Sequence, residues 1–293
     1  MLGAIIGDIV GSVYEVMEVQ AIKQNYDRKR EYNERIKIMD KNVPLFRDDC
    51  SYTDDSVLTI AVADALLHKK NFEETLKEYG LAEASLGVDK YGRSRFGAGF
   101  VKWLHGFGNG DSFGNGAAMR ISSVGYYFDD LESIYKVAKD VTVPSHNHEE
   151  AICGARAIAT SIYLARTGCT KEEIKKYVSA SFGYNLEMNL EILRREYRFS
   201  SRAVGSVPQA IYCFLESNDF EDAIRKAISI GGDTDTIAAM CGGIAEAFYG
   251  IPKEIKEEAL TYLPSEYKDI VLEFYKRLEE KSEVQSNKIL IKK

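Results

Sequence analysis

Two short acidic segments carry the residues of this sequence that are best suited to chemistry. The first reads TDD over residues 53–55, and the second reads GGDTDT over residues 231–236. Taken alone, each segment is typical of a helix N-terminus, because Thr and Asp side chains accept hydrogen bonds from the free N–H groups of a first turn and an acid there complements the helix dipole. Capping is therefore one interpretation of either segment.

The two segments together indicate more than capping. One cap needs one acceptor, yet each segment offers two carboxylates as well as hydroxyl groups. The sequences that follow, DSVLTIAVADALL and TIAAMCGGIAEAFY, are apolar or small on nearly every side, so we expect both helices in the middle of a bundle. Carboxylates converging there would repel one another, and some would have to take up protons. Two divalent cations would balance the four negative charges.

The ligand atoms favour a hard cation. Carboxylate and hydroxyl oxygens select Mg²⁺, Mn²⁺ or Ca²⁺ over zinc or copper. Two such ions, roughly 3.5–4 Å apart, form a known hydrolytic device. The pair of acidic segments therefore predicts a binuclear metal site.

The N-terminal segment GAIIGDIVGSVYE predicts a helix with two distinctive faces. Gly3, Gly7 and Gly11 recur every fourth residue, and such a face lets a neighbouring helix approach closely. A polar stripe runs beside the glycines and consists of Asp8, Ser12 and Glu15. Either this stripe faces solvent on a terminal helix, or it places an acid in a cleft.

A glycine-rich loop and two histidines offer further candidates. Residues 106–116 read GFGNGDSFGNG, and their exposed N–H groups could cradle phosphate oxygens, although a merely flexible loop is equally glycine-rich. The loop is neither a Walker motif nor a dinucleotide fingerprint. His146 and His148 follow in PSHNHEEA, without a third zinc ligand nearby. Exposed imidazoles beside a helix capped by Ser145 or Asn147 are one interpretation, and substrate contact is the other.

The elements that must position these residues are helices. Apolar residues recur at helical spacing almost everywhere, and alternating strand patterns are scarce. We expect one all-α domain over residues 1–281, a frayed polar tail over 282–293, and a charged surface excursion over Gln24–Asp49. The predicted helices are Leu2–Tyr14, Asp55–His68, Phe72–Tyr79, Gly97–Leu104, Leu131–Thr142, Glu149–Arg166, Lys171–Ser181, Val207–Glu216, Asp219–Ser229, Thr234–Tyr249, Lys253–Leu260 and Ser265–Lys281.

Composition sets broad limits on function. The net charge of −7 argues against a general nucleic-acid binder, which needs a basic patch. No apolar stretch reaches the roughly 20 residues of a membrane helix, and Asp8 interrupts the apolar N-terminus, which also lacks the basic region of a signal peptide. Five scattered cysteines form no CxxC pair and indicate buried free thiols. We therefore expect a cytoplasmic protein, and a monomer.

Five separated motifs across about Leu2–Pro252 resemble the ADP-ribosylglycohydrolase family, which includes the dinitrogenase-reductase-activating glycohydrolases and the ADP-ribosyl-acceptor hydrolases. The most specific are YTDDSVLTIAVADALL and SIGGDTDTIAAMCGGIAEAFYG. The resemblance implies an orthogonal multi-helix bundle whose central cleft holds two Mg²⁺ or Mn²⁺ ions. The ligands that it implies are Thr53, Asp54, Asp55, Asp233, Asp235 and Thr236.

The resemblance also implies roles for other residues. Glu15 takes the place of a glutamate that contacts the metal-site water and the substrate ribose, and it is expected to act in catalysis together with Asp55 and Asp235, whereas Asp8 is expected to be structural. The core SFGNGAAMR matches a loop that binds diphosphate and ribose. The implied substrate-binding residues are Gly97, Ser112, Phe113, Gly114, Asn115, Gly116, Met119 and His146.

The activity implied by the resemblance is metal-dependent hydrolysis of the N- or O-glycosidic bond of an ADP-ribosylated protein or small molecule, which releases ADP-ribose. Two alternatives stay open: a non-catalytic, crystallin-like member with a structural metal site, and a metal-dependent nucleotide phosphohydrolase. The segments Gln24–Asp49 and Phe182–Ser201 are where the acceptor would be discriminated, and neither contains a pattern that indicates which acceptor is used.

Overall fold

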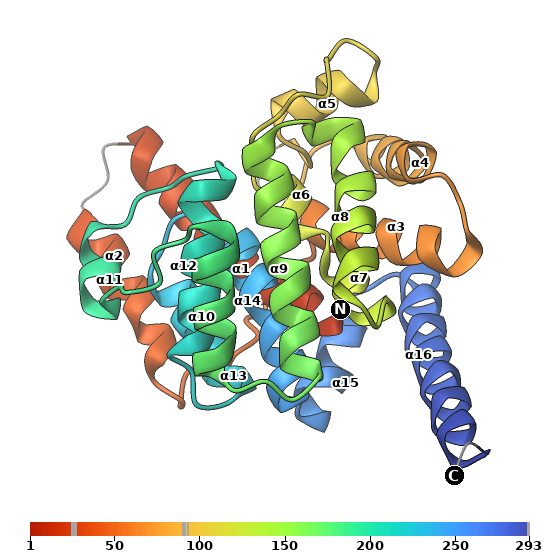
Figure 1. Cartoon of the computed structure of the whole chain (residues 1–293). Helices are drawn as coiled ribbons and strands as arrows, with labels where there is room; N and C mark the ends of the chain where they lie inside the picture. Colours follow the sequence, from red (N-terminus) through yellow and green to blue (C-terminus); the bar gives the residue numbers. More distant parts are fainter. Residues whose placement is uncertain (25–27, 90–91, 93, 292–293) are drawn as a thin grey trace.

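Helix α14 (Thr234–Tyr249) lies at the centre of a bundle that is built from helices alone (Figure 1). The computed structural model describes residues 1–24, 28–89, 92 and 94–291, and the side chains among them except those of 16–30 and 284–291; within these residues every regular element is a helix. Residues 234–245 are all buried. The all-α fold predicted from the helical spacing is confirmed.

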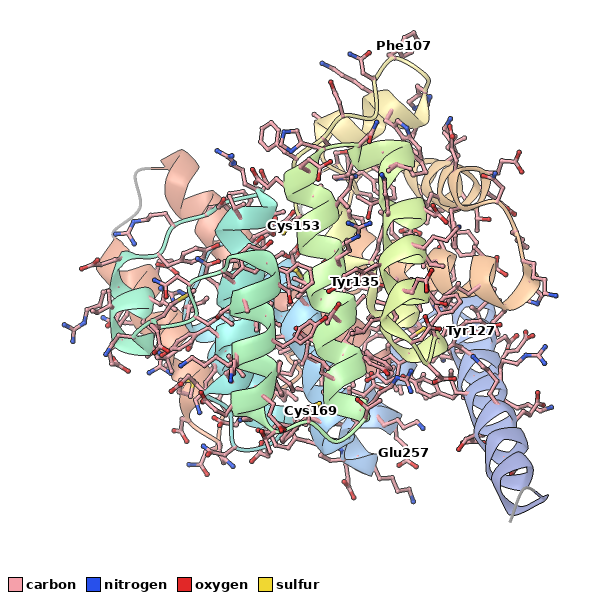
Figure 2. The ribbon with its side chains drawn as sticks, viewed as in Figure 1. Phe107, Tyr127, Tyr135, Cys153, Cys169 and Glu257 are labelled. Carbon is pink, nitrogen blue, oxygen red and sulfur yellow. The ribbon has the colours of Figure 1, made fainter. Side chains whose placement is uncertain are left out.

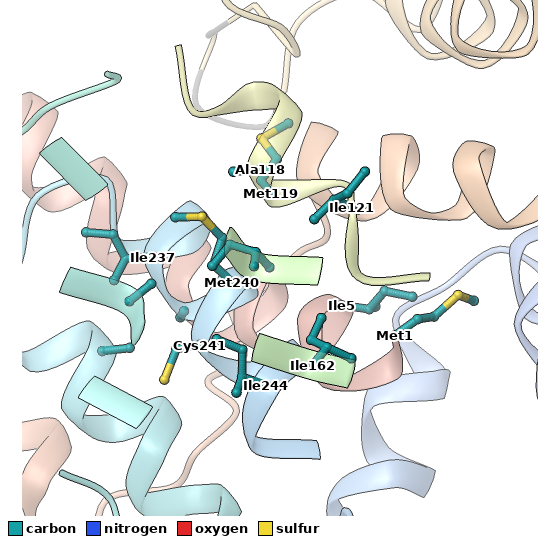
Figure 3. Packing of buried hydrophobic residues seen from close by; sticks show 14 of the residues in the cluster. Met1, Ile5, Ala118, Met119, Ile121, Ile162, Ile237, Met240, Cys241 and Ile244 are labelled. Atoms are coloured by element: carbon teal, nitrogen blue, oxygen red, sulfur yellow. The ribbon is translucent and has the colours of Figure 1, made fainter. Parts of the chain in front are cut away.

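Helix α14 is enclosed by helices from both ends of the chain. It packs on α1 (Leu2–Gln24), α9 (Glu149–Arg166), α12 (Ala203–Leu215) and α13 (Phe220–Ser229). Figure 3 shows Met240 and Ile244 of α14 among Ile5 of α1 and Ile162 of α9. The apolar composition of α14 on every side therefore reflects neighbours on every side.

The glycine face of α1 brings α1 and α14 into backbone contact. A Cβ atom on Gly7 would lie 2.0 Å from the carbonyl oxygen of Ala238, and one on Gly11 would lie 2.5 Å from the Cα of Asp235. On α14, a Cβ on Gly242 would lie 2.1 Å from the carbonyl oxygen of Gly3. The predicted close approach at both glycine-containing faces is confirmed, and it places α1 directly beside the start of α14.

Helix α3 (Asp54–His68) is the second central helix. Its residues 55–67 are all buried, as its apolar sequence predicts. The Thr53 side chain caps its N-terminus by accepting from the Asp55 N–H, and Lys69 ends the helix in a left-handed conformation with φ 54°. Helix α3 packs on α1, on α4 (Phe72–Ala84) and on α16 (Ser265–Ile291). The starts of α3 and α14 therefore both lie against α1.

Every predicted helix is present, with different bounds for several. Helix α1 continues to Gln24 and α16 to Ile291, ten residues beyond the predicted end at Lys281. Pro144 lies inside a helix that the sequence predicts to end at Thr142. Pro208 lies inside a helix that the sequence predicts to begin at Val207, and that helix begins earlier, at Ala203. The remaining elements are α2 (Arg28–Ile36), η1 (Lys37–Met39), α5 (Ala98–Leu104), α6 (Gly116–Met119), α7 (Ser122–Tyr127), α8 (Leu131–His146), α10 (Lys171–Phe182), α11 (Leu190–Glu196) and α15 (Lys253–Thr261).

The segment Gln24–Asp49 packs more closely on the bundle than the predicted surface excursion, because Arg35, Ile38, Leu45 and Phe46 are buried. Residues 25–27 lie outside the described part of the chain. Beyond them Arg35, 5% exposed, donates to the carbonyl oxygens of Ser229 and Arg194. Arg225 in turn donates to the Ile38 carbonyl oxygen. Buried arginines thus anchor this charged segment to α13 and α11. The irregular spacing of its apolar residues does not predict these contacts.

Two further expectations can be compared with the structure. Among the described helices, none combines the length and apolarity that a bilayer-spanning helix requires. All five cysteines are free thiols. Three of them are buried, namely Cys50, Cys213 and Cys241, whereas Cys153 and Cys169 are partly exposed.

Candidate metal centre and substrate loop

The two acidic segments meet in space beside α1. One oxygen from each of Asp8, Asp55 and Asp235 lies within 4.8 Å of the others, and the same holds for Glu15, Asp233 and Asp235. Asp235 belongs to both groups. The arrangement is a double acidic cluster joined by one carboxylate, and it brings together residues separated by more than 200 positions in the sequence.

Asp8 fixes the start of α3 onto α1. It is fully buried, and its carboxylate accepts hydrogen bonds from the backbone N–H and the hydroxyl of both Thr53 and Ser56. The structural role expected for Asp8 agrees with these four bonds. Its membership of the acidic cluster was not predicted, although its place on the same stripe as Glu15 was an available signal.

Asp55 has an oxygen that lacks a partner. Its Oδ2 accepts from the Thr236 hydroxyl at 3.2 Å, whereas its Oδ1 is buried and has no hydrogen-bond partner in the part of the chain that the structure describes. A buried carboxylate oxygen without a partner is costly. A hard cation would satisfy it, so the residues present fit the metal that the sequence predicts.

Burial and mutual repulsion raise the pKa of every carboxyl at the start of α3 and α14. The pKa of Asp54, Asp55 and Asp235 rises well above its ordinary value, first through burial and then through neighbouring negative charges. Burial raises the pKa of Asp8 and of Asp233 to about 6. A positive charge placed among these groups would reverse the shifts.

The other predicted metal ligands surround the same cluster. The Thr53 hydroxyl donates to Asp8 Oδ1 at 2.6 Å and caps α3, and the Thr236 hydroxyl donates to Asp55. After burial, the negative charges of Asp8, Glu15 and Asp233 raise the pKa of Asp54 further. Glu15, Thr53 and Asp54 are partly exposed, so the cluster has an open side toward solvent.

The glycine-rich loop is tied directly to this cluster. Asn115, 6% exposed, donates from Nδ2 to Asp233 Oδ2 at 2.7 Å. Its backbone N–H donates to the Ser201 carbonyl oxygen at 2.8 Å, and the Ala203 N–H donates to the Phe113 carbonyl oxygen at 3.2 Å. The loop is therefore held between the start of α12 and the acidic cluster. The sequence gives no signal for the Asn115 side chain as this link.

His146 faces the loop from the end of α8. It is 6% exposed, and a Cβ atom on Gly116 would lie 2.9 Å from its Nε2 atom. Burial lowers the pKa of His146 well below its usual value, and the positive charge of Arg120 adds to this shift. The imidazole is thus neutral and packed against the glycine-rich loop. The interpretation of His146 as an exposed imidazole is therefore wrong.

A buried hydrogen-bond chain orients the His146 ring. Arg120 is fully buried, and its NH2 atom donates to Ser145 Oγ at 2.8 Å. Ser145 Oγ lies 2.8 Å from His146 Nδ1. Ser145 Oγ accepts from Arg120 and can donate its hydroxyl hydrogen to Nδ1, an arrangement that favours the tautomer with the ring hydrogen on Nε2, the atom beside the loop. No local pattern in the sequence indicates this role for Arg120.

His148 has a different place. It is exposed, and its side chain caps α9 by accepting from the Glu150 N–H at 3.2 Å. Capping of this helix by Ser145 or Asn147 is therefore wrong, and the cap is the second histidine itself. The His148 ring also contacts Phe113 edge-on, with 5.8 Å between the ring centroids.

The remaining predicted substrate residues lie at various distances from the cluster. Phe113 is half exposed, Ser112 Oγ accepts from the Gly114 N–H at 3.1 Å, and the Met119 sulfur lies 3.9 Å from the Thr236 hydroxyl. Gly97 is an exposed residue before α5, and no interaction within the described residues joins it to the acidic cluster. The structure thus places Met119 next to the centre and leaves Gly97 apart.

Comparison with known proteins identifies the family. The ADP-ribosylglycohydrolase family model matches residues 1–288, and the chain belongs to this family. It is similar to ADP-ribosylhydrolase ARH3 of Mus musculus, with 26% identity over 86% of this chain and 83% of that protein. The Homo sapiens ARH3 is 25% identical over 96% of this chain and 93% of that protein.

A solved structure shares the fold. The chain is similar to an ADP-ribosylglycohydrolase-related protein complex, with a TM-score of 0.58 and 20% identity, over 77% of this chain and 81% of that one. The family and its ARH3 relatives support an ADP-ribosyl hydrolase.

Proposed function

We propose that this protein is a metal-dependent hydrolase that cleaves the N- or O-glycosidic bond between an acceptor and C1′ of an ADP-ribosyl group. The observation that carries the proposal is the pair of acidic groups that share Asp235, next to a buried and unpartnered Asp55 oxygen. The tie between Asn115 and Asp233 puts the glycine-rich loop beside these acids. A site for cations and a site for phosphates are thus adjacent.

The residues that would hold two divalent cations are Asp55, Asp233 and Asp235, with Thr53, Asp54 and Thr236 close by. Bound there, Mg²⁺ or Mn²⁺ would supply Lewis-acid polarisation of oxygen atoms and lower the pKa of water. The shared position of Asp235 supports a centre for two ions rather than one.

Glu15 is placed to act on the attacking water. It lies at the partly exposed side of the cluster beside Asp233 and Asp235, on the rigid face of α1. A carboxylate there accepts the proton that water loses as it attacks C1′. The bond from C1′ to the acceptor breaks, and the acceptor leaves with the bonding electrons and takes up a proton from solvent, while nearby carboxylate oxygens stabilise the oxocarbenium-like sugar. Asp55 and Asp235 contribute to that stabilisation. Products are ADP-ribose and the unmodified acceptor.

The loop is placed to hold the diphosphate and ribose of the substrate. The backbone N–H groups of Phe113 and Gly116, which have no acceptor among the described residues, offer donors to phosphate oxygens, and His146 Nε2 faces the same loop. The buried charge of Arg120, two hydrogen bonds away, favours an anion at this position. Phe113 offers an exposed ring for apolar contact.

Product analysis tests the proposal. Purified protein is treated with EDTA, returned to Mg²⁺ or Mn²⁺, and incubated with arginine-linked, serine-linked and small-molecule-linked ADP-ribose. We expect free ADP-ribose only with added cation, and at least a hundred-fold less from Asp235→Asn, while the exposed Asp48→Asn retains full activity. Full activity in chelator would contradict the metal mechanism. AMP or phosphate as product would indicate the phosphohydrolase, and no product from any substrate would favour a non-catalytic member.

A further inference from the structure

A cavity that shares no lining residue with the acidic cluster lies between α9, α12 and the segment that follows α10. Its volume is about 480 Å³, within the range of roughly 300–1,000 Å³ of small-molecule sites. Cys153, which lines it, sits on α9 where that helix faces α10 and α12 (Figure 2). The full lining is Glu150, Cys153, Phe182, Gly183, Tyr184, Asn185, Met188, Val204, Pro208 and Gln209.

Two polar atoms of the lining residues have no hydrogen-bond partner. They are the Tyr184 hydroxyl and Gln209 Oε1, both buried and both unpaired within the described residues. Tyr184 is 9% exposed. The Cys153 thiol donates to the Phe182 carbonyl oxygen at 3.8 Å, and it lies close enough to the Tyr184 hydroxyl to add to the rise that burial causes in the pKa of that hydroxyl. Native proteins rarely leave such atoms unpaired, so these two could pair with a ligand where the described residues supply no partner.

The chemistry of the lining selects the partner. Gln209 Oε1 accepts hydrogen bonds, the Tyr184 hydroxyl can accept one, and the Glu150 carboxylate adds negative charge with only 9% of its side chain exposed. The rest of the wall is largely apolar, with Phe182, Met188, Val204 and Pro208. A flat cation with several N–H donors and an apolar body matches this combination, as an amidine or guanidinium compound does.

The cavity is linked to the glycine-rich loop. Glu150 accepts from Arg202 NH2 at 2.7 Å and from the Val204 N–H at 3.2 Å. Arg202 lies over the Phe113 ring, with 5.1 Å from its central carbon to the ring centroid. A cation that bonds Glu150 competes with Arg202 for that carboxylate. Occupation of the cavity would therefore alter the contact between Arg202 and Phe113.

We propose that this cavity is a binding site for a small amidine or guanidinium cation, held by Glu150, Tyr184 and Gln209. Residues 183–189 form an irregular segment between α10 and α11, and a shift of this segment would expose the two unpaired atoms to the ligand. The site is separate from the acidic cluster, and the proposal does not depend on the proposed glycosidic activity.

Calorimetric titration of the full chain with benzamidine tests the proposal, with benzoate as the matched anion. We expect saturable one-to-one binding of benzamidine and none of benzoate. Glu150→Gln should weaken benzamidine binding at least ten-fold, while Glu187→Gln, which removes an 80%-exposed carboxylate on the neighbouring segment, should leave it unchanged. Equal binding to the wild-type protein and Glu150→Gln, or no binding of benzamidine, would overturn the proposal.

Two further variants test the unpaired atoms by stability rather than by activity. Tyr184→Phe and Gln209→Leu remove the unpaired oxygens while keeping similar shapes, and replacing an unsatisfied polar group in this way is neutral or stabilising. We expect an unchanged or higher midpoint of urea unfolding, together with at least a five-fold loss of benzamidine affinity. A lower midpoint would show that these atoms already have partners within the protein, and that result would refute the assignment.

Discussion

The side-chain amide of Asn115 donates to Asp233 Oδ2 at 2.7 Å and thereby joins the glycine-rich loop to the acidic cluster. Both side chains are buried. A displacement of the loop is therefore coupled to a displacement of one of the candidate metal ligands, so that the parts expected to bind phosphate and cation move as a unit.

Replacing Asn115 tests this link. Asn115→Ala removes a hydrogen bond to a carboxylate, which is worth about 1.5–3 kcal/mol, so we expect kcat/KM for ADP-ribosylated substrate to fall about 10- to 100-fold. The exposed Asn109→Ala, in the same loop, is the control and should retain wild-type kinetics. Equal kinetics for both variants would mean that the bond between Asn115 and Asp233 has no role in turnover.

The contact between α1 and α14 predicts a large loss of stability. A Cβ on Gly7 would lie 2.0 Å from a carbonyl oxygen of α14, and neither backbone can yield easily, so Gly7→Ala should cost about 3 kcal/mol of unfolding free energy or more. At Gly99, inside α5, a Cβ meets no atom within 4 Å, so Gly99→Ala should be neutral or stabilise the protein by up to about 1 kcal/mol. Urea unfolding of both variants measures the difference. Similar midpoints would contradict the close packing.

The raised carboxyl pKa values predict how stability depends on pH. In the folded protein without cations, the pKa of Asp8 and of Asp233 is about 6, against 3.8 as the ordinary value. The folded form therefore binds more protons than the unfolded form in this interval, and the stability that these groups contribute is lost as the pH rises through about 6. Urea unfolding in EDTA should show a lower midpoint at pH 7.5 than at pH 5, and a smaller difference for Asp233→Asn.

Cations should reverse that loss. At pH 7.5 millimolar Mg²⁺ or Mn²⁺ should raise the unfolding midpoint, because an ion that binds the folded state alone stabilises it by mass action. K⁺ at the same ionic strength separates specific binding from screening, and Ca²⁺ tests selectivity among divalent cations. An identical midpoint with EDTA and with every divalent cation would argue against a metal site.

The chain of Arg120, Ser145 and His146 predicts a tautomer. Ser145→Ala removes the hydroxyl beside His146 Nδ1, so we expect the Nε2–H form to lose its dominance in ¹⁵N NMR spectra of labelled histidine. The KM for substrate should rise about five-fold, as one hydrogen bond of about 1 kcal/mol is weakened. Ser85→Ala, at the exposed serine that caps the C-terminus of α4, is the control. An unchanged tautomer would show that Ser145 does not orient the ring.

The sequence predicts the central part of this architecture well, for a physical reason. Helices α3 and α14 are apolar on every side and begin with acids, so their burial and the meeting of their starts both follow from the residues. The spacing of Gly3, Gly7 and Gly11 likewise predicts the helix contact that the structure contains. These features are local patterns whose period coincides with that of the helix.

Other features depend on partners far away in the chain, which no local pattern reveals. Arg35 in a highly charged stretch gives no sign that it is buried against α13. Asn115 could equally have been a loop residue with a free side chain, and Arg120 follows an apolar turn without any nearby acid. Long-range hydrogen bonds position each of these side chains, and such bonds depend on the packed fold rather than on spacing.

The pairing of α1 with α14 also has a consequence for biosynthesis. Asp8 and Glu15 form one wall of the acidic cluster, and they are translated more than 200 residues before Asp233 and Asp235 of the opposite wall. A nascent chain therefore carries Asp8 and Glu15 throughout that interval without the carboxylates that complete the cluster. The cluster cannot form until residue 235 has been added and has left the exit tunnel, so a fragment that ends before this residue would lack it.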